Sequence, residues 1–281
     1  MSFMEMLESR ENKKKYKSIS FSSGGTAGVS LCGAVEQLHI EGVLSSIENY
    51  AGASVGSVIA MALACGSSFN FLLKEVSNVK MDSLLDYKTR FHAMYNLYYY
   101  YGICEGNEML KWIENILEKL TGNPDITFEQ VHERFGGRLV IIGTDLESHT
   151  PVYFDYVNNP TMMVKIAVRI STSIPFVFQP VNYLGKTYTD GAVTTSLPDV
   201  FDPSETLYIL LSQGRCVQID TFHGMINALV NCYAGQIKHL INRQNIIEIP
   251  CDGSSADFYM NEDSINELIE TGRNSVKKYF S

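Results

Sequence analysis

The sequence predicts an α/β sandwich, because strand-like segments alternate with helical ones along much of the chain. Residues 206–211, TLYILL, form a continuous apolar run that is typical of a buried parallel strand. The chain has 281 residues, of which 45% are hydrophobic, so it is long enough to bury a full core. We therefore expect one large domain with helical additions.

The N-terminal part is expected to run strand, glycine loop, helix, strand, tight turn and helix. Residues 17–22, KSISFS, alternate polar and apolar side chains and then break at two glycines. From Leu31 onwards, apolar residues recur at i, i+3, i+4 and i+7, which predicts a helix. Residues 47–52, IENYAG, predict a second short strand, and the helical spacing returns from Val55.

The middle of the chain continues this alternation. Apolar residues between Met109 and Leu120 form a helical stripe, and TFEQVHERF begins with a capping box of Thr127 and Gln130. LVIIGTDL and PVYFDY predict two strands joined by ESHT. Beyond position 220, helical spacing is seen at Ile226, Val230, Tyr233 and Ile237.

Charge and composition limit the classes of function. The formal net charge of −9 argues against a nucleic-acid surface and against generic electrostatic binding to anionic membranes. The N-terminus, MSFMEMLESRENKKK, has no apolar core of signal-peptide length, and no later run approaches the roughly 20 apolar residues that span a bilayer. We expect an intracellular protein that is soluble or peripherally associated with membranes.

The cysteines and histidines do not predict a metal site. Neither a C-x-x-C pair nor a zinc-type His spacing is present, so reduced thiols and no metal or other cofactor are expected. The six cysteines are Cys32, Cys65, Cys104, Cys216, Cys232 and Cys251.

Residues 52–56, GASVG, raise the question of whether Ser54 is a nucleophile or a small residue that fits a tight turn. The pentapeptide alone leaves both interpretations open. A strand, helix, parallel strand unit usually places its strands side by side, so the loop SSGGTAG and this turn should be neighbours. Backbone N–H groups of Gly24, Gly25 and Thr26 could then stabilise an oxyanion when Ser54 attacks a carbonyl, with the N–H of Val55 as a further donor.

The sequence resembles the patatin-like phospholipases, which are lipid acyl hydrolases with a Ser–Asp dyad. Four motifs occur in the family's order: the loop from Ser23 to Gly28, GASVG, AVRISTSIPFVFQP and YTDGAVTTSLP. In the last of these, Asp190 matches the Asp of the family's D-G-A/G motif. TDLESHTPVYFDY also resembles the family's central hairpin, and the match covers about residues 17–211.

The resemblance implies a three-layer α/β/α sandwich with a mostly parallel central sheet and a helical C-terminal extension. It divides the chain into an N-terminal extension (1–16), a catalytic domain (17–211) and a helical part packed on the same domain (212–281). It implies that Ser54 is the nucleophile and that Asp190 is the base. The glycines expected to support these motifs are Gly28, Gly52, Gly56 and Gly191.

As partners, the resemblance implies a lipid substrate and transient contact with a membrane surface. It leaves open the class of lipid and the oligomeric state. Two departures from the family pattern bear on this: Ser23 replaces the first loop glycine, and Ala27 replaces the usual Arg or Lys. They keep a second function open, a lipid-binding or scaffolding protein with little turnover.

Other interpretations remain for several residues. His223 and His239 follow Asp190, so a Ser, Asp, His order is formally available, although both fall on an expected helix. A nucleotide-binding Gly loop should be followed by an acidic residue at the end of the second strand, and this strand ends in AGAS. Arg169 and Ser171 are expected to support the site.

FHAMYNLYYYYG, residues 91–102, is unusually rich in tyrosine. It is expected to form either a core helix or hairpin, or a lid or wall for an acyl chain. Tyrosine suits a lipid–water boundary because it has an apolar body and a polar tip.

Overall fold

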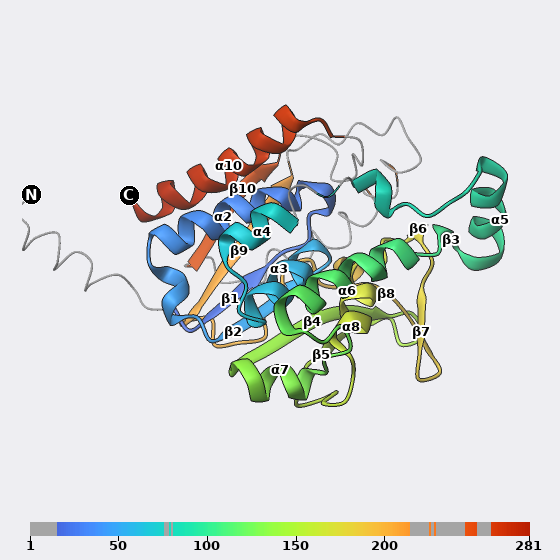
Figure 1. Cartoon of the computed structure of the whole chain (residues 1–281), viewed down its shortest axis with the longest axis horizontal. Coiled ribbons are helices and arrows are strands. Elements are labelled where there is room, and N and C mark those ends of the chain that lie inside the picture. Colours follow the sequence, from blue (N-terminus) through green and yellow to red (C-terminus); the bar gives the residue numbers. More distant parts are fainter. Residues whose placement is uncertain are drawn as a thin grey trace, which may run out of the picture.

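A computed structural model describes residues 16–75, 79, 81–213, 225, 228, 245–251 and 260–281 (Figure 1). Within these residues the strands are β1 (Ser18–Phe21), β2 (Asn49–Ala53), β3 (Gly102–Cys104), β4 (Arg138–Asp145), β5 (Thr150–Phe154), β6 (Phe176–Phe178), β7 (Val181–Tyr183), β8 (Lys186–Asp190), β9 (Thr206–Gln213) and β10 (Ile246–Cys251). The helices are α2 (Val29–Ile40), α3 (Val55–Ala64), α4 (Phe69–Glu75), α5 (Arg90–Tyr100), α6 (Asn107–Thr121), α7 (Phe128–Phe135), α8 (Val164–Ser171) and α10 (Glu262–Phe280). Short 3₁₀ helices are η1 (Gly25–Gly28), η2 (Val43–Ser46), η3 (Met81–Leu84) and η4 (Gly191–Val193).

The central sheet has the strand order β10-β9-β1-β2-β4-β8-β7, and β5 pairs with β4 off this path. Strands β10, β9, β1, β2 and β4 run parallel to one another. Strands β5 and β8 are antiparallel to β4, and β7 is antiparallel to β8. The predicted α/β class, with a mostly parallel sheet flanked by helices, is confirmed. The predicted buried strand 206–211 lies within β9, and the predicted hairpin is β4–β5.

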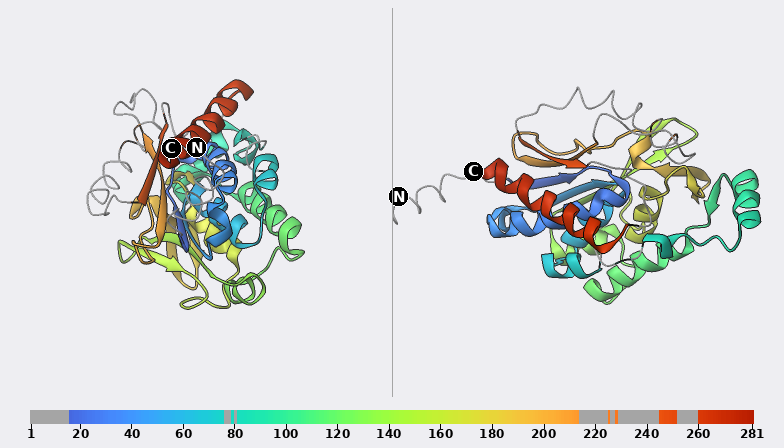
Figure 2. Two further views of the ribbon diagram at one scale, coloured as in Figure 1. Left: turned by 90° about the vertical axis from the view of Figure 1, so that its left-hand side faces the viewer. Right: turned by 90° about the horizontal axis from the view of Figure 1, so that it is seen from above.

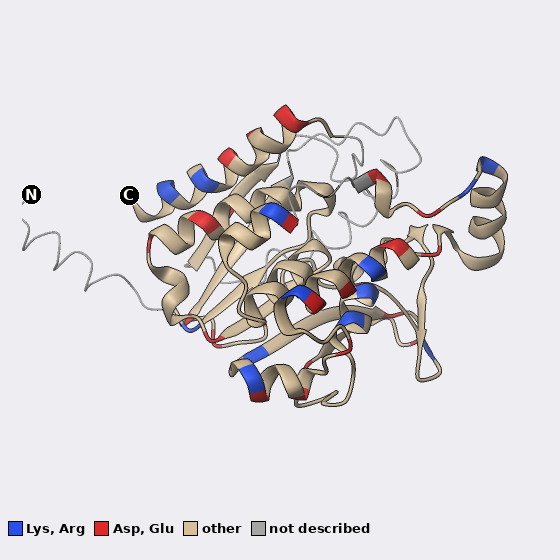
Figure 3. Cartoon of the chain, viewed as in Figure 1, with Lys and Arg blue, Asp and Glu red and all other residues tan. Residues whose placement is uncertain are grey.

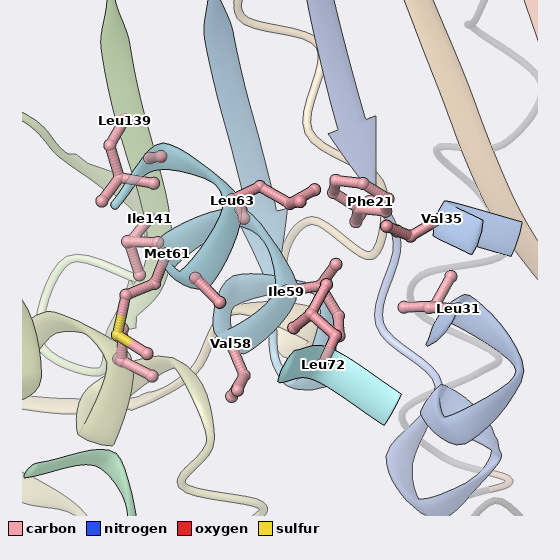
Figure 4. Packing of buried hydrophobic residues seen from close by; sticks show 14 of the residues in the cluster. Phe21, Leu31, Val35, Val58, Ile59, Met61, Leu63, Leu72, Leu139 and Ile141 are labelled. Carbon is pink, nitrogen blue, oxygen red and sulfur yellow. The ribbon is translucent and has the colours of Figure 1, made fainter. Parts of the chain in front are cut away.

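Helix α3 is buried on all sides, because its residues 56–64 are almost all apolar and none is exposed. Its side chains Val58, Ile59 and Met61 belong to the main hydrophobic core, which also includes Leu139 and Ile141 of β4 (Figure 4). The helix therefore has a fixed position against the sheet. This matters because α3 begins directly after Ser54.

The helical spacings predicted for the middle of the chain are confirmed. Helix α6 buries Met109, Ile113, Ile116 and Leu117 of its apolar stripe, and Leu120 is half-buried. Helix α7 begins with the predicted capping box, in which the N–H of Gln130 donates to Thr127 Oγ1 at 3.3 Å and the N–H of Thr127 donates to Gln130 Oε1 at 3.0 Å.

The C-terminal part contributes both a strand and a helix. Strand β10 was not predicted, and it extends the sheet in parallel beside β9. Helix α10 packs against α2, as Figure 2 shows from two sides. The predicted helical spacing at Ile226, Val230, Tyr233 and Ile237 lies outside the described residues.

The tyrosine-rich segment forms helix α5, but the expectation that it belongs to the core is wrong. Most of its large side chains are exposed, including Phe91, Tyr98 and Tyr99. The helix extends away from the rest of the molecule and connects to β3, which pairs with β6 in a small parallel sheet (Figures 1 and 2). In the part of the chain that the structure describes, no helix is both long and apolar enough to cross a membrane.

Candidate active site

Ser54 lies in a tight turn between β2 and α3, with φ 52° and ψ −127°. A positive φ is uncommon for a residue with a side chain, and such backbone strain concentrates at functional sites. The two flanking glycines allow the turn to close. A Cβ on Gly52 would lie 2.2 Å from the carbonyl oxygen of Gly56, and a Cβ on Gly56 would lie 2.6 Å from the carbonyl oxygen of Phe21.

The side chains of Ser54 and Asp190 are hydrogen-bonded. Ser54 Oγ donates to Asp190 Oδ2 at 2.7 Å, and the backbone N–H of Ala192 donates to the other carboxylate oxygen at 2.8 Å. Asp190 is the last residue of β8, which pairs with β4 and brings the carboxylate to the end of the sheet where β2 also ends. The structure thus brings together the two residues that the sequence predicted as a dyad.

Burial changes the acidity of Asp190. The loss of solvent raises the pKa of its carboxyl group to about 7, although the hydrogen bonds from Ala192 and Ser54 oppose this change. Asp190 is 2% exposed. A carboxylate with a pKa near neutrality is a much better proton acceptor than an ordinary aspartate, and it is within hydrogen-bond reach of the hydroxyl.

Ser54 lies in a pocket that also contains residues of the glycine loop. Gly25, Thr26 and Val55 line the pocket beside Ser54, so the structure places the loop and the turn together as predicted. The remaining wall is mainly apolar, and its residues include Leu84, Met109, Trp112, Ile174 and Phe178. The empty space inside the pocket and at its mouth is about 470 Å³.

Thr26 has a feature that sequence analysis could not reveal. It is 3% exposed, and its Oγ1 is the single buried side-chain polar atom without a hydrogen-bond partner among the residues that the structure describes. A buried hydroxyl without a partner costs free energy, and such groups in native proteins often have a functional role. Thr26 therefore brings a free hydroxyl to the wall of the Ser54 pocket.

Comparison with known proteins decides the family. Residues 19–198, more than half of the chain, match the model of the family described as patatin-like phospholipase. The chain belongs to the patatin-like phospholipase family.

The chain is also similar to individual proteins and to a solved structure. The chain is 28% identical over 286 residues to an uncharacterised protein of Acanthamoeba polyphaga mimivirus, which covers 95% of this chain and 94% of the relative. It is 27% identical over 191 residues to a probable lipid hydrolase of Invertebrate iridescent virus 6, covering 66% of this chain and 62% of that protein. The crystal structure of VipD from Legionella pneumophila is similar with a TM-score of 0.68 and 16% identity, covering 95% of this chain and 67% of that chain, which shows a shared fold.

In this member of the patatin-like phospholipase family, α8 holds the turn that carries Ser54. The backbone N–H of Ser54 donates to Ser171 Oγ at 2.9 Å, and Ser171 is fully buried. Arg169 of the same helix donates to the carbonyl oxygens of Gly106 at 3.1 Å and Glu105 at 2.8 Å. Burial lowers the pKa of Arg169 to about 10. These contacts support the expectation that Arg169 and Ser171 position the site.

The remaining predicted positions can be located in part. Gly28 packs against the side chain of Val55, and a Cβ on Gly191 would lie 2.3 Å from the carbonyl oxygen of Ile142. His223 and His239 lie outside the described residues, so the structure does not test them. Among the residues that it does describe, no three His, Cys, Asp or Glu side chains are grouped as a metal site would require.

The departure from the family pattern at Ser23 has a structural explanation. The backbone N–H of Ser23 donates to the carbonyl oxygen of Ser196 at 2.7 Å, and the two hydroxyls are 3.0 Å apart. Ser196 follows the D-G-A motif in the same motif segment, YTDGAVTTSLP. Ser23 thus connects the glycine loop to the segment that carries Asp190.

The departure from the family pattern at Ala27 is explained by its buried position, which leaves little room for a longer side chain. Ala27 is 8% exposed and belongs to the main hydrophobic core, so its methyl group contacts apolar side chains. Ala27→Arg is therefore expected to lower the free energy of unfolding by about 1 to 3 kcal/mol, since it overpacks the core and buries a charge. Thermal unfolding measures this loss.

The same Ala27→Arg variant tests whether this position controls the choice of head group. We expect its kcat/KM ratio between a phospholipid and a matched neutral ester to equal that of the wild type. A variant with an unchanged Tm and a selective gain on the phospholipid would contradict the structural explanation.

Proposed function

We propose that the protein is a lipid acyl hydrolase that cleaves fatty acyl esters through an acyl-enzyme on Ser54. The observation that carries this proposal is the 2.7 Å hydrogen bond from Ser54 to the buried carboxylate of Asp190 beside an apolar pocket. Membership of the patatin-like phospholipase family and the similarity to a probable lipid hydrolase support lipid hydrolysis in general.

In the first half-reaction, Ser54 Oγ forms a bond to the ester carbonyl carbon while its proton passes to Asp190. The tetrahedral intermediate then breaks its bond to the alcohol oxygen, which leaves with the proton held by Asp190. In the second half-reaction, water attacks the acyl carbon and gives a proton to Asp190. Ser54 leaves with that proton, and the fatty acid is released.

The negative charge on the intermediate needs donors at the end of the sheet. We propose the backbone N–H groups of Gly24, Gly25 and Thr26, with that of Val55, for this role. The backbone N–H of Ser54 is already used by Ser171 and does not contribute. The start of α3 adds the positive end of its helix dipole close to Ser54.

The apolar wall of the pocket suits the acyl chain rather than a polar head group. Met109 and Trp112 of α6, with Phe178 of β6, offer hydrophobic contacts to a hydrocarbon chain whose carbonyl lies at Ser54. Asp190, behind Ser54, is itself buried, and this burial raises its pKa.

The unpartnered hydroxyl of Thr26 predicts opposite effects on stability and activity. We propose that Thr26 Oγ1 donates a hydrogen bond to the substrate's carbonyl oxygen. Thr26→Val keeps the side-chain shape, so we expect the free energy of unfolding to be unchanged or about 1 kcal/mol higher, while kcat for a short-chain ester falls roughly tenfold to a hundredfold.

Thr26→Ser is the matched control, because it keeps the hydroxyl and should retain most of the activity. Chemical denaturation measures the free energy of unfolding, and steady-state kinetics measure kcat. Equal kcat values for the Val and Ser variants would show that the hydroxyl has no part in the reaction.

Labelling by a fluorophosphonate probe tests the function and separates it from its rival. An acyl hydrolase should be labelled on Ser54, and Ser54→Ala should not be labelled. A lipid-binding or scaffolding protein of this fold should bind lipid without being labelled and without releasing fatty acid. Mass spectrometry of mixed lipids after incubation with wild type and with Ser54→Ala would then identify the ester that is cleaved.

A further inference from the structure

A set of exposed aromatic side chains covers α5 and the residue after it. We call residues 90–101 the tyrosine arm. Four of its side chains are exposed by more than 60%: Phe91 at 86%, Tyr98 at 77%, Met94 at 69% and Tyr101 at 66%. Large apolar groups that gather on a protein surface mark a site of interaction with a partner or a membrane.

The rings of the tyrosine arm pack on one another and not on the body of the protein. The ring centroids of Tyr95 and Tyr99 are 4.7 Å apart, and those of Tyr98 and Tyr99 are 4.9 Å apart. The helix is nevertheless anchored to β3. Asn96 is buried, and its Nδ2 donates to the carbonyl oxygen of Ile103 at 3.3 Å. The arm is thus a formed helix that presents a continuous aromatic surface.

The segments that precede and follow the tyrosine arm both contribute residues to the Ser54 pocket. Leu84, which precedes it, and Met109, which follows it, both line that pocket. The strand β3 that leaves the arm pairs with β6, whose Phe178 also lines the pocket. Figures 1 and 2 show the arm extending outwards beyond this end of the molecule. A membrane or partner surface that bound the tyrosine arm would therefore lie near the Ser54 pocket.

The charge of this segment differs from that of the whole chain. From Tyr87 to Cys104 the sequence contains no Asp or Glu, although the chain has 31 of them and a net charge of −9. Lys88 and Arg90 are both exposed at the start of α5, where Figure 3 shows basic residues and no acidic ones. This local positive charge complements the anionic phosphates of a membrane surface.

We propose that the tyrosine arm inserts its aromatic side chains into the interfacial layer of a phospholipid membrane, with Lys88 and Arg90 at the phosphates. Tyrosine favours this layer because its ring enters the apolar region while its hydroxyl stays hydrated. A helix of 11 residues is too short to span a bilayer but can lie in its surface. The purpose of this docking, delivery of lipid to Ser54, rests on the function proposed above.

Vesicle binding of the full-length protein tests the proposal without requiring activity. The probe is sedimentation with vesicles of phosphatidylcholine alone and of phosphatidylcholine with phosphatidylserine. The double substitution Phe91→Ser and Tyr98→Ser should lower the partition coefficient roughly tenfold or more on both. The matched control, Ile40→Ser with Val157→Ser, removes two side chains that are 65% and 60% exposed elsewhere, and it should bind as wild type does.

The charged side chains are tested separately. Wild type should bind vesicles that contain phosphatidylserine more tightly than vesicles of phosphatidylcholine alone, by about fivefold for each basic residue. The variant Lys88→Glu with Arg90→Glu should lose most of this difference. Binding to phosphatidylcholine alone should change much less. Equal losses on both kinds of vesicle would contradict the role given to these two side chains.

Two further measurements, ester hydrolysis by the arm variant and vesicle binding by Ser54→Ala, separate this proposal from the proposed hydrolysis. The arm variant should hydrolyse a soluble short-chain ester at the wild-type rate, and Ser54→Ala should bind vesicles as wild type does. If no ester is cleaved but the arm variant still loses vesicle binding, hydrolysis fails and the docking surface stands. Wild-type vesicle binding by the arm variant would overturn the proposal. So would a change from dimer to monomer in the arm variant without vesicles, because the surface would then bind a second copy of the chain.

Discussion

Ser54→Ala and Asp190→Asn should each reduce the turnover of a short-chain ester by roughly 10³-fold or more. The physical reason is that Ser54 Oγ and the Asp190 carboxylate share one hydrogen bond, and within the described residues no histidine lines their pocket to replace the missing base. Initial rates of each purified variant measure the effect.

A matched control for Asp190→Asn is Asp155→Asn. Asp155 is also a fully buried aspartate, but it binds Arg138 and the loop after β5 rather than Ser54. Its Asn variant is expected to lose stability and to keep turnover per folded molecule within about threefold of the wild type, on the scale of indirect effects. Near-normal turnover in a folded Asp190→Asn would instead point to a different base, with His223 and His239 as the first residues to examine.

The value of kcat/KM for a neutral ester should rise with pH and level off above about pH 7. Ser54 can give up its proton only when Asp190 is ionised, and burial raises the pKa of Asp190 to about 7. The rate should therefore fall about tenfold for each pH unit below this value, or about a hundredfold by pH 5. A flat profile between about pH 5 and 8 would exclude Asp190 as the group that titrates.

The same pKa predicts how stability depends on pH. Between the ordinary aspartate pKa of 3.8 and about 7, the folded protein keeps a proton on Asp190 that the unfolded chain has released. The free energy of unfolding that Asp190 contributes therefore falls as the pH rises through this window. Since Asn does not titrate, the stability of Asp190→Asn relative to wild type should increase over the window by on the order of 4 kcal/mol and then stay constant. Denaturation at several pH values measures this difference independently of catalysis.

Much of the candidate site could be predicted because its residues are constrained by local chemistry. A tight turn that leads from a strand into a helix needs small residues, and GASVG supplies them around Ser54. The parallel pairing of β1 with β2, in which Phe21 lies opposite Gly52, then places the glycine loop beside that turn. Asp190 could be assigned only through the resemblance, since most Asp-Gly pairs are ordinary turns.

Other features depend on contacts that a linear pattern does not contain. Strand β10 includes Pro250, which argues against a central strand, and the structure places it at the edge of the sheet where a proline is tolerated. The bond from Ser54 to Ser171 Oγ and the missing partner of Thr26 arise only when distant segments meet. The sequence did not predict that the tyrosine arm is exposed, because large aromatic side chains on every face show no periodicity that would separate a buried helix from an exposed one.

The hydrogen bond between Ser54 and Asp190 joins residues that are 136 positions apart. Their strands, β2 and β8, are connected through β4, which pairs with both. A nascent chain that has not yet reached β8 has Ser54 and the glycine loop but lacks Asp190. We therefore expect the contact between Ser54 and Asp190 to form only after β8 has paired with β4. The hydrolysis proposed above should therefore be absent from chains that end before Asp190, because the order of the strands keeps Ser54 without its carboxylate until β8 has been made.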